Sequence, residues 1–447
     1  MPYISNTDRD RQKILSVIGV QKFEDLISSI PAKLRLDKPL NLDEPLSELE
    51  ITNKIKAQTC QNICAGSANA FLGAGVYDHF IPAAVDTIVS RPEFFTAYTP
   101  YQAEVSQGTL QFIYEYQTMI CELTGMEIAN ASLYDGASAV AEAILMAVRK
   151  NKLMKAILPA TLHPEFVKVI KVYTEGIGVE LLTAPEKDGR IDLKALEAML
   201  DDTIGSVVVQ NPNFYGNLEA VSELDAIIHA KPKCLLIACV DPISLGIINP
   251  PAGYNADIVV GEGQALGNSM YMGGPLFGFF ATKLDNARQM PGRIVGATLD
   301  KDGNKAYALT LQAREQHIRR NKATSNICSN QSLCTLAATV YMCLMGREGL
   351  KEVATQSAQK AHYAAVELCK IPGISLAYPQ APFFKEFVIN TPKPASQLIK
   401  LMLPRIIYPG VDMAAFGKPN ALLIAVTEKK SKADIDALVK AMQEVVK

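Results

Sequence analysis

Tryptophan is absent from this chain of 447 residues, histidine occurs five times, and lysine is missing from the whole stretch between Asp257 and Gly278. The histidines form neither an HxxxH nor an HExxH pattern, so we expect no metal site. Excess positive charge is also absent, because 44 basic residues face 46 acidic ones and leave a net charge of −2. This balance gives no electrostatic reason to expect nucleic acid or a membrane surface as a partner.

Long apolar runs are missing as well. The longest in the C-terminal half, LCTLAATVYMCLMG at 333–346, is too short to cross a membrane and is typical of a buried helix. The first residues, MPYISNTDRDRQK, are polar and charged, unlike a signal peptide. The nine scattered cysteines are therefore expected to be reduced thiols of a cytoplasmic protein. Cys60 and Cys64 lie one helical turn apart without a further ligand nearby, which favours a pair in a helix core over a metal site.

The chain divides into three predicted parts. Residues 1–70 form an arm of helices and a proline-broken extended stretch that has no core of its own. Residues 71–320 form a large domain, and residues 321–447 form a smaller α+β domain whose last helix begins after an N-cap at Ser431. The arm helices are predicted at 8–17, 23–30 and 48–64, and the small-domain elements at 330–345, 350–368, 383–389, 421–426 and 431–446.

Strands and helices alternate through the large domain. Short apolar runs, such as SVVVQ at 206–210 and CLLIACV at 234–240, are separated by segments with helical spacing. Regular alternation of this kind predicts a parallel sheet that helices cover on both faces. The other predicted elements are strands at 155–159, 179–185, 257–260 and 276–282 and helices at 106–123, 136–150, 163–175, 192–200 and 220–230.

Polar residues follow three of the predicted strands. Asn211 and Asp241 come directly after two of them, and Gln264 lies in the Gly-rich stretch after a third. Ligands of open α/β sheets bind beyond the carboxyl ends of the strands, so three such ends indicate a site. The alternative for each is a simple turn, because Asn, Asp and Gly favour turns.

The start of the helix at Gly136, Ala137 and Ser138 is a second candidate. A helix N-terminus presents free N–H groups and partial positive charge, and small residues allow a phosphate to approach. The alternative is structural, with Gly136 in a turn and Ser138 as a cap.

Two further segments are unusually rich in hydrogen-bonding groups. His79, between Asp78 and Phe80, is a candidate for acid–base chemistry, with a polar residue at a helix start as the alternative. The segment around Pro100 and the stretch 321–331 carry the remaining candidates. They are Tyr98, Thr99, Tyr101, Gln102, Glu104, Ser106 and Gln107 in the first segment, and Thr324, Ser325 and Asn326 in the second.

With these segments in view, the chain resembles the glycine-cleavage P-proteins, and within them subunit 1 of the two-subunit form. Five segments carry the resemblance, which covers nearly the whole chain. They are FLGAGVYDHFIPAAV at 71–85, FFTAYTPYQAEVSQGTLQ at 94–111, ASLYDGASAVAEA at 131–143, DIVVGEGQALGNSMYMGGPLFGFFAT at 257–282 and REQHIRRNKATSNIC at 314–328.

The resemblance implies an aspartate-aminotransferase-like fold, fold type I of the enzymes that use pyridoxal phosphate (PLP), with a mainly parallel large sheet. It implies PLP-dependent decarboxylation of glycine and transfer of the aminomethyl group to the lipoyl arm of H-protein. The Schiff-base lysine would belong to subunit 2, and its position here falls at about Ala265. An α2β2 assembly is implied, in which this chain is inactive alone and completes its partner's site.

The resemblance also suggests roles for the candidates. Residues 98–107, His79 and Thr324–Asn326 would help to complete the partner's pocket, and Gly273 and Gly274 would approach its phosphate. Gly136–Ser138, Asn211, Asp241 and Gln264 would be remnants of a cofactor site. Two alternatives remain open: a self-sufficient PLP enzyme that uses Lys283, and an assembly partner without a catalytic role.

Overall fold

The computed structural model describes residues 5–36, 38, 40–63, 68–270 and 274–447. The chain separates into two compact units, Met1–Ile63 and Cys64–Lys447. The predicted division into an arm, a large domain and a small domain stays a prediction. Among the described residues, no helix is both long and apolar enough to span a membrane.

The first unit consists of short helices without a core. Helices α1 (Asp8–Ile18), α2 (Phe23–Leu26) and α3 (Glu48–Thr59) are local structures, and the side chains of Thr7 and Ser47 cap two of them. None of this unit's described residues is buried. Helices α2 and α3 are shorter than predicted, and Cys60 is exposed just beyond α3, so the predicted core pair is wrong for Cys60. Cys64 lies outside the described residues.

A seven-stranded sheet forms the centre of the second unit. Its order is β2 (Ile128–Ala129), β10 (Gly278–Thr282), β9 (Ile258–Glu262), β8 (Leu235–Val240), β7 (Ile204–Asn211), β3 (Lys155–Pro159) and β4 (Glu180–Ala184). Strands β9, β8, β7, β3 and β4 run parallel, whereas β10 is antiparallel to both β9 and β2. The predicted mainly parallel sheet is therefore confirmed.

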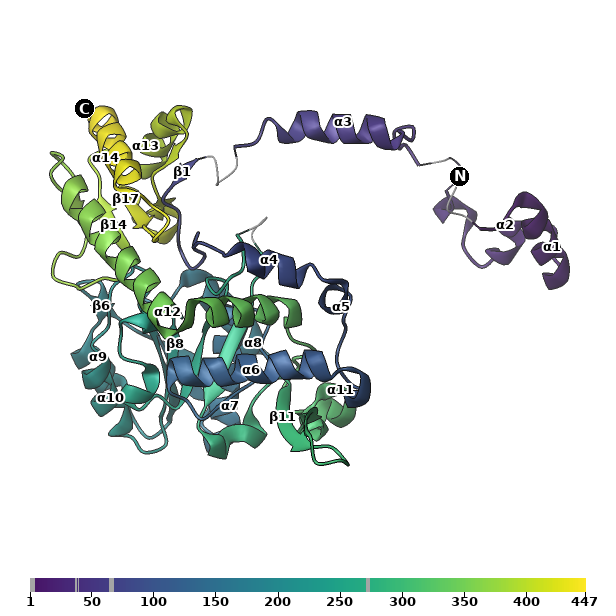
Figure 1. The fold of residues 1–447 in the computed structure, drawn as a ribbon, viewed down its shortest axis with the longest axis horizontal. Helices are drawn as coiled ribbons and strands as arrows, with labels where there is room; N and C mark the ends of the chain where they lie inside the picture. The colour runs from purple at the N-terminus through teal and green to yellow at the C-terminus, as the bar shows by residue number, and fades with distance from the viewer. Residues whose placement is uncertain (1–4, 37, 39, 64–67, 271–273) are drawn as a thin grey trace. The chain divides into compact units, whose positions relative to one another are not determined.

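Helices cover both faces of this sheet (Figure 1). Val208 of β7 packs with helices α7 (Gly136–Asn151) and α8 (Pro164–Glu175), whereas Val207 and Val209 point to the opposite face. That face is covered by α6 (Gln107–Thr124), α9 (Leu193–Met199), α10 (Val221–His229) and the first half of α12 (Ser332–Leu368). Alternate residues of a strand point to opposite faces, so the continuous apolar runs of the sequence are explained by double burial.

Helix α12 connects the large sheet to a smaller one. It bends at Gly346, whose φ of 59° and ψ of −172° lie outside helical geometry, and where glycine avoids the strain of a side chain. The smaller sheet is antiparallel, in the order β13 (Ser375–Leu376), β14 (Glu386–Asn390), β17 (Ala421–Ala425) and β16 (Val411–Asp412). Its core includes residues of the second half of α12, α13 (Ala395–Met402) and α14 (Lys432–Val446). Ser431 caps α14, as predicted.

The remaining elements are short. A hairpin of β11 (Ile294–Leu299) and β12 (Lys305–Thr310) packs on α6 and was not predicted. The others are α4 (Ala83–Val89), α5 (Pro92–Phe95), α11 (Gln316–Arg319), the parallel pair β1 (Asn69–Ala70) and β15 (Ile407–Tyr408), the pair β5 (Glu186–Lys187) and β6 (Arg190–Ile191), and several single-turn 3-10 helices.

Candidate functional site

A pocket lies at the carboxyl ends of the parallel strands, where the sequence predicts a site. Strands β7, β8 and β9 deliver Gln210, Asp241 and Glu262 to it. Ala265 follows on the loop after β9 and forms part of the wall. The other sides come from elsewhere in the chain, because Tyr77, His163, Phe384, Lys385 and Glu386 also line the pocket. Parallel strands place all their carboxyl ends at one edge, which explains this convergence.

Asp241 forms an ion pair with a buried lysine. Its Oδ2 atom lies 2.6 Å from Nζ of Lys385, and its Oδ1 atom accepts a hydrogen bond from the Ile243 N–H at 3.0 Å. Only 1% of Lys385 is exposed, and its ammonium group lies 3.7 Å from the centre of the Tyr77 ring. A buried lysine needs compensation of this kind, since an isolated buried charge is costly.

His79 belongs to the same network. Its Nε2 atom lies 2.8 Å from Lys385 Nζ, and its Nδ1 atom lies 2.6 Å from Oε2 of Glu428. Because an ammonium group can only donate and a carboxylate accepts, Nε2 accepts and Nδ1–H donates. Burial, together with the positive charge of Lys385, lowers the pKa of His79. The histidine is therefore neutral at pH 7. The alternative of a polar residue at a helix start is wrong, because the next helix, α4, begins only at Ala83.

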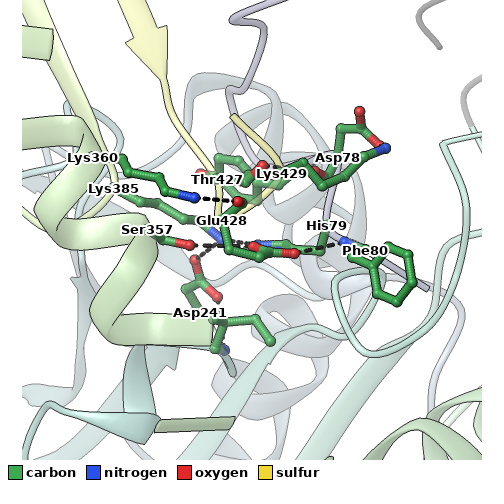
Figure 2. A network of polar contacts seen from close by, with 12 residues as sticks. Asp78, His79, Phe80, Asp241, Ser357, Lys360, Lys385, Thr427, Glu428 and Lys429 are labelled. Atoms are coloured by element: carbon green, nitrogen blue, oxygen red, sulfur yellow. Dashed lines mark hydrogen bonds and ion pairs between the residues drawn. The ribbon is translucent and has the colours of Figure 1, made fainter. Parts of the chain in front are cut away.

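Figure 2 shows how this network joins distant segments. Glu428 accepts from the Phe80 N–H at 2.6 Å and from the Ser357 hydroxyl of α12 at 3.3 Å. Lys429 pairs with Asp78 at 2.6 Å. Ion pairs and hydrogen bonds to charged groups thus hold together five parts of the chain: the segment before α4, helix α12, the start of β14, the loop after β17 and the end of β8.

Glu262 occupies the N-terminal end of α7. Its Oε2 atom accepts from the Gly136 N–H at 2.9 Å, and its Oε1 atom accepts from the N–H groups of Gln264 and Phe277, both at 3.0 Å. Burial raises the pKa of Glu262 to about 7, while the N–H of Gly136 and the other two donors oppose the rise. A β-carbon on Gly136 would lie 2.9 Å from the Glu262 nitrogen, so the contact leaves no space between them.

Asp135, not Ser138, is the N-cap of α7. The Ser138 N–H donates to Asp135 Oδ1 at 2.7 Å, and the Asp135 N–H donates to Ser138 Oγ at 3.1 Å. The predicted alternative of a cap at Ser138 is therefore wrong, although Ser138 completes the capping box. Ala137 is buried beside it.

Tyr77 and Glu386 close the pocket from the remaining side, and Gln264 bonds to the backbone of Tyr77. Gln264 Oε1 accepts from the Tyr77 N–H at 3.0 Å, so this predicted residue holds the segment before α4 in place. The Tyr77 hydroxyl donates to Glu386 Oε2 at 2.8 Å, and the Ala74 N–H donates to Oε1 of the same carboxyl at 2.7 Å. Burial raises the pKa of Glu386 to about 7.

Several predicted residues lie elsewhere. Asn211 turns away from the pocket and accepts from the Glu219 N–H at 3.0 Å. Lys283 follows β10 at the opposite edge of the sheet, because Thr282 pairs with Ile258 at the beginning of β9. Its ammonium group pairs with Asp257 at 2.8 Å, too far along the sheet to serve this pocket. Gly274 is half-buried, and Gly273 lies outside the described residues.

The segment 98–107 lies beside the other polar stretch. Arg293, which is 4% exposed, donates to the Tyr101 hydroxyl at 3.0 Å and to the Cys328 carbonyl at 3.0 Å. The ring of Tyr101 also meets that of His317 edge-on. Arg293 therefore bonds to both predicted segments and holds them together. Tyr98, in contrast, is 81% exposed and contacts nothing polar that the structure describes.

The other members of these segments have structural contacts or are exposed. The Gln107 side chain bonds both N–H and C=O of Tyr307 at 2.9 Å and so holds β12 against α6. The Thr324 N–H donates to the Arg314 carbonyl at 3.1 Å, and Ser325 Oγ accepts from the Ile327 N–H at 3.0 Å. Ser106 lies before α6 as its N-cap, and Thr99 is half-buried. Gln102, Glu104 and Asn326 are exposed.

Sequence reasoning missed Lys385, Glu386 and His163 as site residues. His163 packs on Phe166 with ring centres 4.8 Å apart, and its Nε2 atom lies 2.9 Å from the Ala74 carbonyl oxygen. The available signal was the pair Lys385–Glu386 inside the apolar run FFKEFVI, since two charges in a buried strand require partners.

Comparison with known proteins decides the family. A model of the glycine cleavage system P-protein matches residues 1–442. The chain belongs to this family. A probable glycine dehydrogenase (decarboxylating) subunit 1 of Carboxydothermus hydrogenoformans is 52% identical over 443 residues, which cover 99% of each chain. The protein of the same description from Chloroherpeton thalassium is 50% identical and covers 100% of each chain.

Solved structures agree with this P-protein fold. A crystal structure of glycine decarboxylase (P-protein) in inhibitor-bound form is 42% identical, with a TM-score of 0.90 over 100% of both chains. A sphingosine-1-phosphate lyase of Burkholderia pseudomallei is 14% identical with a TM-score of 0.67 over 92% of this chain and 93% of its own, which shows the fold alone. The predicted fold type I is confirmed, and the chain is a P-protein of the subunit 1 type.

The pocket of this P-protein does not fit PLP. The remaining cavity has a volume of about 50 Å³, whereas ligand pockets commonly measure about 300–1,000 Å³. Glu262 would place a carboxylate at the helix end where a phosphate would bind. Asp241, the residue type that pairs with the pyridine nitrogen of PLP, is already paired with Lys385. Ala265 supplies no amine.

Proposed function

We propose that this chain is the subunit of a two-subunit glycine decarboxylating P-protein that does not hold PLP and that completes the site of its partner. The observation that carries the proposal is Ala265 at the wall of the pocket, in a loop whose sequence has no lysine between Asp257 and Gly278. Subunit 2 would bind PLP through its own lysine. The cofactor supplies an electron sink for the carbanion that remains when CO2 leaves glycine. The lipoyl arm of H-protein would then accept the aminomethyl group.

A second lysine needs to be considered, because Lys385 lies in the pocket itself. Its ammonium group is 2.6 Å from Asp241. Asp241 would meet the ring nitrogen of PLP, and the aldehyde that reacts with a lysine is at the opposite end of the ring. A Schiff base on Lys385 would therefore deprive Asp241 of its partner and place the ring in a space that Tyr77 and His79 fill. This geometry disfavours a self-sufficient enzyme built on Lys385.

The segment 98–107 is the contribution that we propose for the partner's site. Tyr98 is 81% exposed and Tyr101 is 48% exposed, which is unusual for two aromatic side chains so close together. Arg293 holds Tyr101 from below, so the segment has a defined position although its outer face is open. We propose an α2β2 assembly in the cytoplasm, in which this face meets subunit 2. We also propose that Gly273 and Gly274 approach the phosphate of the partner's PLP and that Thr324–Asn326 help to complete its pocket.

Reconstitution tests this function. The purified chain, mixed with PLP, is expected to show no absorbance of an internal aldimine and to catalyse no exchange of CO2 with glycine. Activity is expected only after a lysine-bearing subunit 2 is added. A borohydride-reducible PLP adduct on Lys385 or Lys283 would contradict the proposal and favour the self-sufficient enzyme.

Substitution of the exposed segment distinguishes an active-site role from a scaffold role. Tyr98→Ala and Tyr101→Phe are expected to lower the exchange rate of the reconstituted pair about 10-fold or more if they position substrate or catalytic groups. Val172→Ala is the matched control, because Val172 is 75% exposed on the outer face of α8. Size-exclusion chromatography verifies that each pair assembles. Full exchange activity in intact Tyr98→Ala and Tyr101→Phe pairs would favour a chain that only stabilises subunit 2.

A further inference from the structure

The helix end that would bind a phosphate already holds a carboxyl group from its own chain. Helix α7 has 16 residues, and its first N–H group, that of Gly136, donates to the carboxyl of Glu262. The same carboxyl accepts from the backbone N–H groups of Gln264 and Phe277. Three converging N–H groups at a helix N-terminus form the usual cradle for a phosphate. Here one side chain satisfies all three.

The opposite end of the pocket repeats this arrangement with the charges reversed. Asp241 would balance a protonated pyridine nitrogen, and Lys385 supplies a positive nitrogen 2.6 Å away instead. The Tyr77 ring and His79 fix the position of that nitrogen. The two charged features of PLP, an anion at the helix end and a cation at the aspartate, thus each have a counterpart in this chain.

We propose that Glu262 and Lys385 are built-in replacements for the two charged ends of PLP. They close this pocket to the cofactor. With their partners they form a fixed connection, called the clamp below, between the large sheet and the smaller one. The clamp is physically reasonable because removal of a cofactor alone would leave three unpaired N–H groups and an unpaired aspartate, both of which are costly when buried. The proposal depends on the proposed function only in that PLP is held elsewhere in the pair.

The first consequence concerns inorganic phosphate. In Glu262→Ala, the three N–H groups lose their acceptor and a space opens at the end of α7. Thermal unfolding of the full chain is followed while phosphate is titrated at constant ionic strength with chloride. The unfolding temperature of Glu262→Ala is expected to fall and then to rise with phosphate in a saturable way, by about 2–4 °C. The wild-type chain is expected to show no saturable rise.

Glu219→Ala is the matched control. Glu219 is 6% exposed and accepts from the Thr161 hydroxyl, the Asn213 amide and the Ile191 N–H, and none of these three donors is an N–H group of a helix. Its loss also removes a buried carboxyl, so any general effect of phosphate on a weakened fold appears in both variants. A saturable response of the wild-type chain, or equal responses of the two alanine variants, would overturn the proposal.

A count of cofactor molecules provides a test that does not depend on how the variants fold. The reconstituted wild-type pair is denatured in alkali, and the released PLP is measured per pair of subunits. We expect one PLP per pair, and two would overturn the proposal. The two proposals fail separately. A pair with one PLP and a phosphate-responsive Glu262→Ala but no glycine–CO2 exchange would refute the proposed function and leave the clamp intact.

Discussion

Replacement of Lys385 by methionine is the sharpest test of how the pocket is held. Methionine keeps most of the apolar stem of lysine, so packing changes little while the ammonium group is lost. Asp241 then lacks its partner at 2.6 Å, and His79 lacks the donor at its Nε2 atom. Removal of one partner of a buried ion pair commonly costs about 3–5 kcal/mol, because the other charge stays buried.

The expected magnitude lies at the lower end of this range. The Asp241 side chain is 13% exposed, so water reaches it to some extent, and we expect a loss of about 3 kcal/mol in the free energy of unfolding. For a unit of roughly 380 residues, the unfolding entropy is about 0.8 kcal/mol per kelvin, and the unfolding temperature should fall by about 4 °C. Calorimetry of Lys385→Met beside the wild-type chain measures both quantities.

The double variant Lys385→Met/Asp241→Asn isolates the pair. It removes both charges, so we expect it to be more stable than Lys385→Met by about 2 kcal/mol. Loss of the neighbouring positive charge should also raise the pKa of His79, which NMR titration of the ring protons detects. Strictly additive losses in the double variant, or an unchanged unfolding temperature in Lys385→Met, would refute the conclusion that this ion pair holds the pocket.

Three further predictions concern other parts of the chain. Burial raises the pKa of Cys239 to about 12, whereas Cys328 is exposed, so a thiol reagent at pH 8 should modify Cys328 at least ~1,000-fold faster, as mapped by mass spectrometry. Hydrogen bonds to two aspartates raise the pKa of His229 above 6.5. Its stabilising effect is therefore complete below pH 6.5 and disappears as the pH rises through the raised pKa. In urea unfolding, His229→Asn should lose more free energy of unfolding at pH 6 than at pH 9, and equal losses would contradict this direction. Gly216→Ala places a β-carbon 1.8 Å from a backbone carbonyl oxygen of β14 at a φ of +83°, whereas Gly303 has the same φ and open space around it; the Gly216 variant should therefore lose about 3 kcal/mol or more, and Gly303→Ala about 1 kcal/mol.

Sequence patterns predicted the elements that local interactions determine. The helix that ends at Gly125, where φ is 73°, and the helix that Ser431 caps both follow from residues within one turn of each end. The doubly buried strands were predicted because burial on both faces leaves continuous apolar runs. The hairpin of β11 and β12 was missed, since it packs on α6 and gains stability from residues far away in the sequence.

For the site, the sequence alone determined three features: no lysine in the loop after β9, Asp241 at a strand end, and a family resemblance that covers the chain. It did not determine what fills the pocket. Lys385 reaches Asp241 and His79 across 144 and 306 positions of sequence, and Glu262 accepts from the first N–H of a helix that begins 126 residues earlier. Such pairs depend on how strands and helices pack. A buried charge is tolerated only beside an opposite charge or a hydrogen-bond partner, and the tertiary structure decides which group that is.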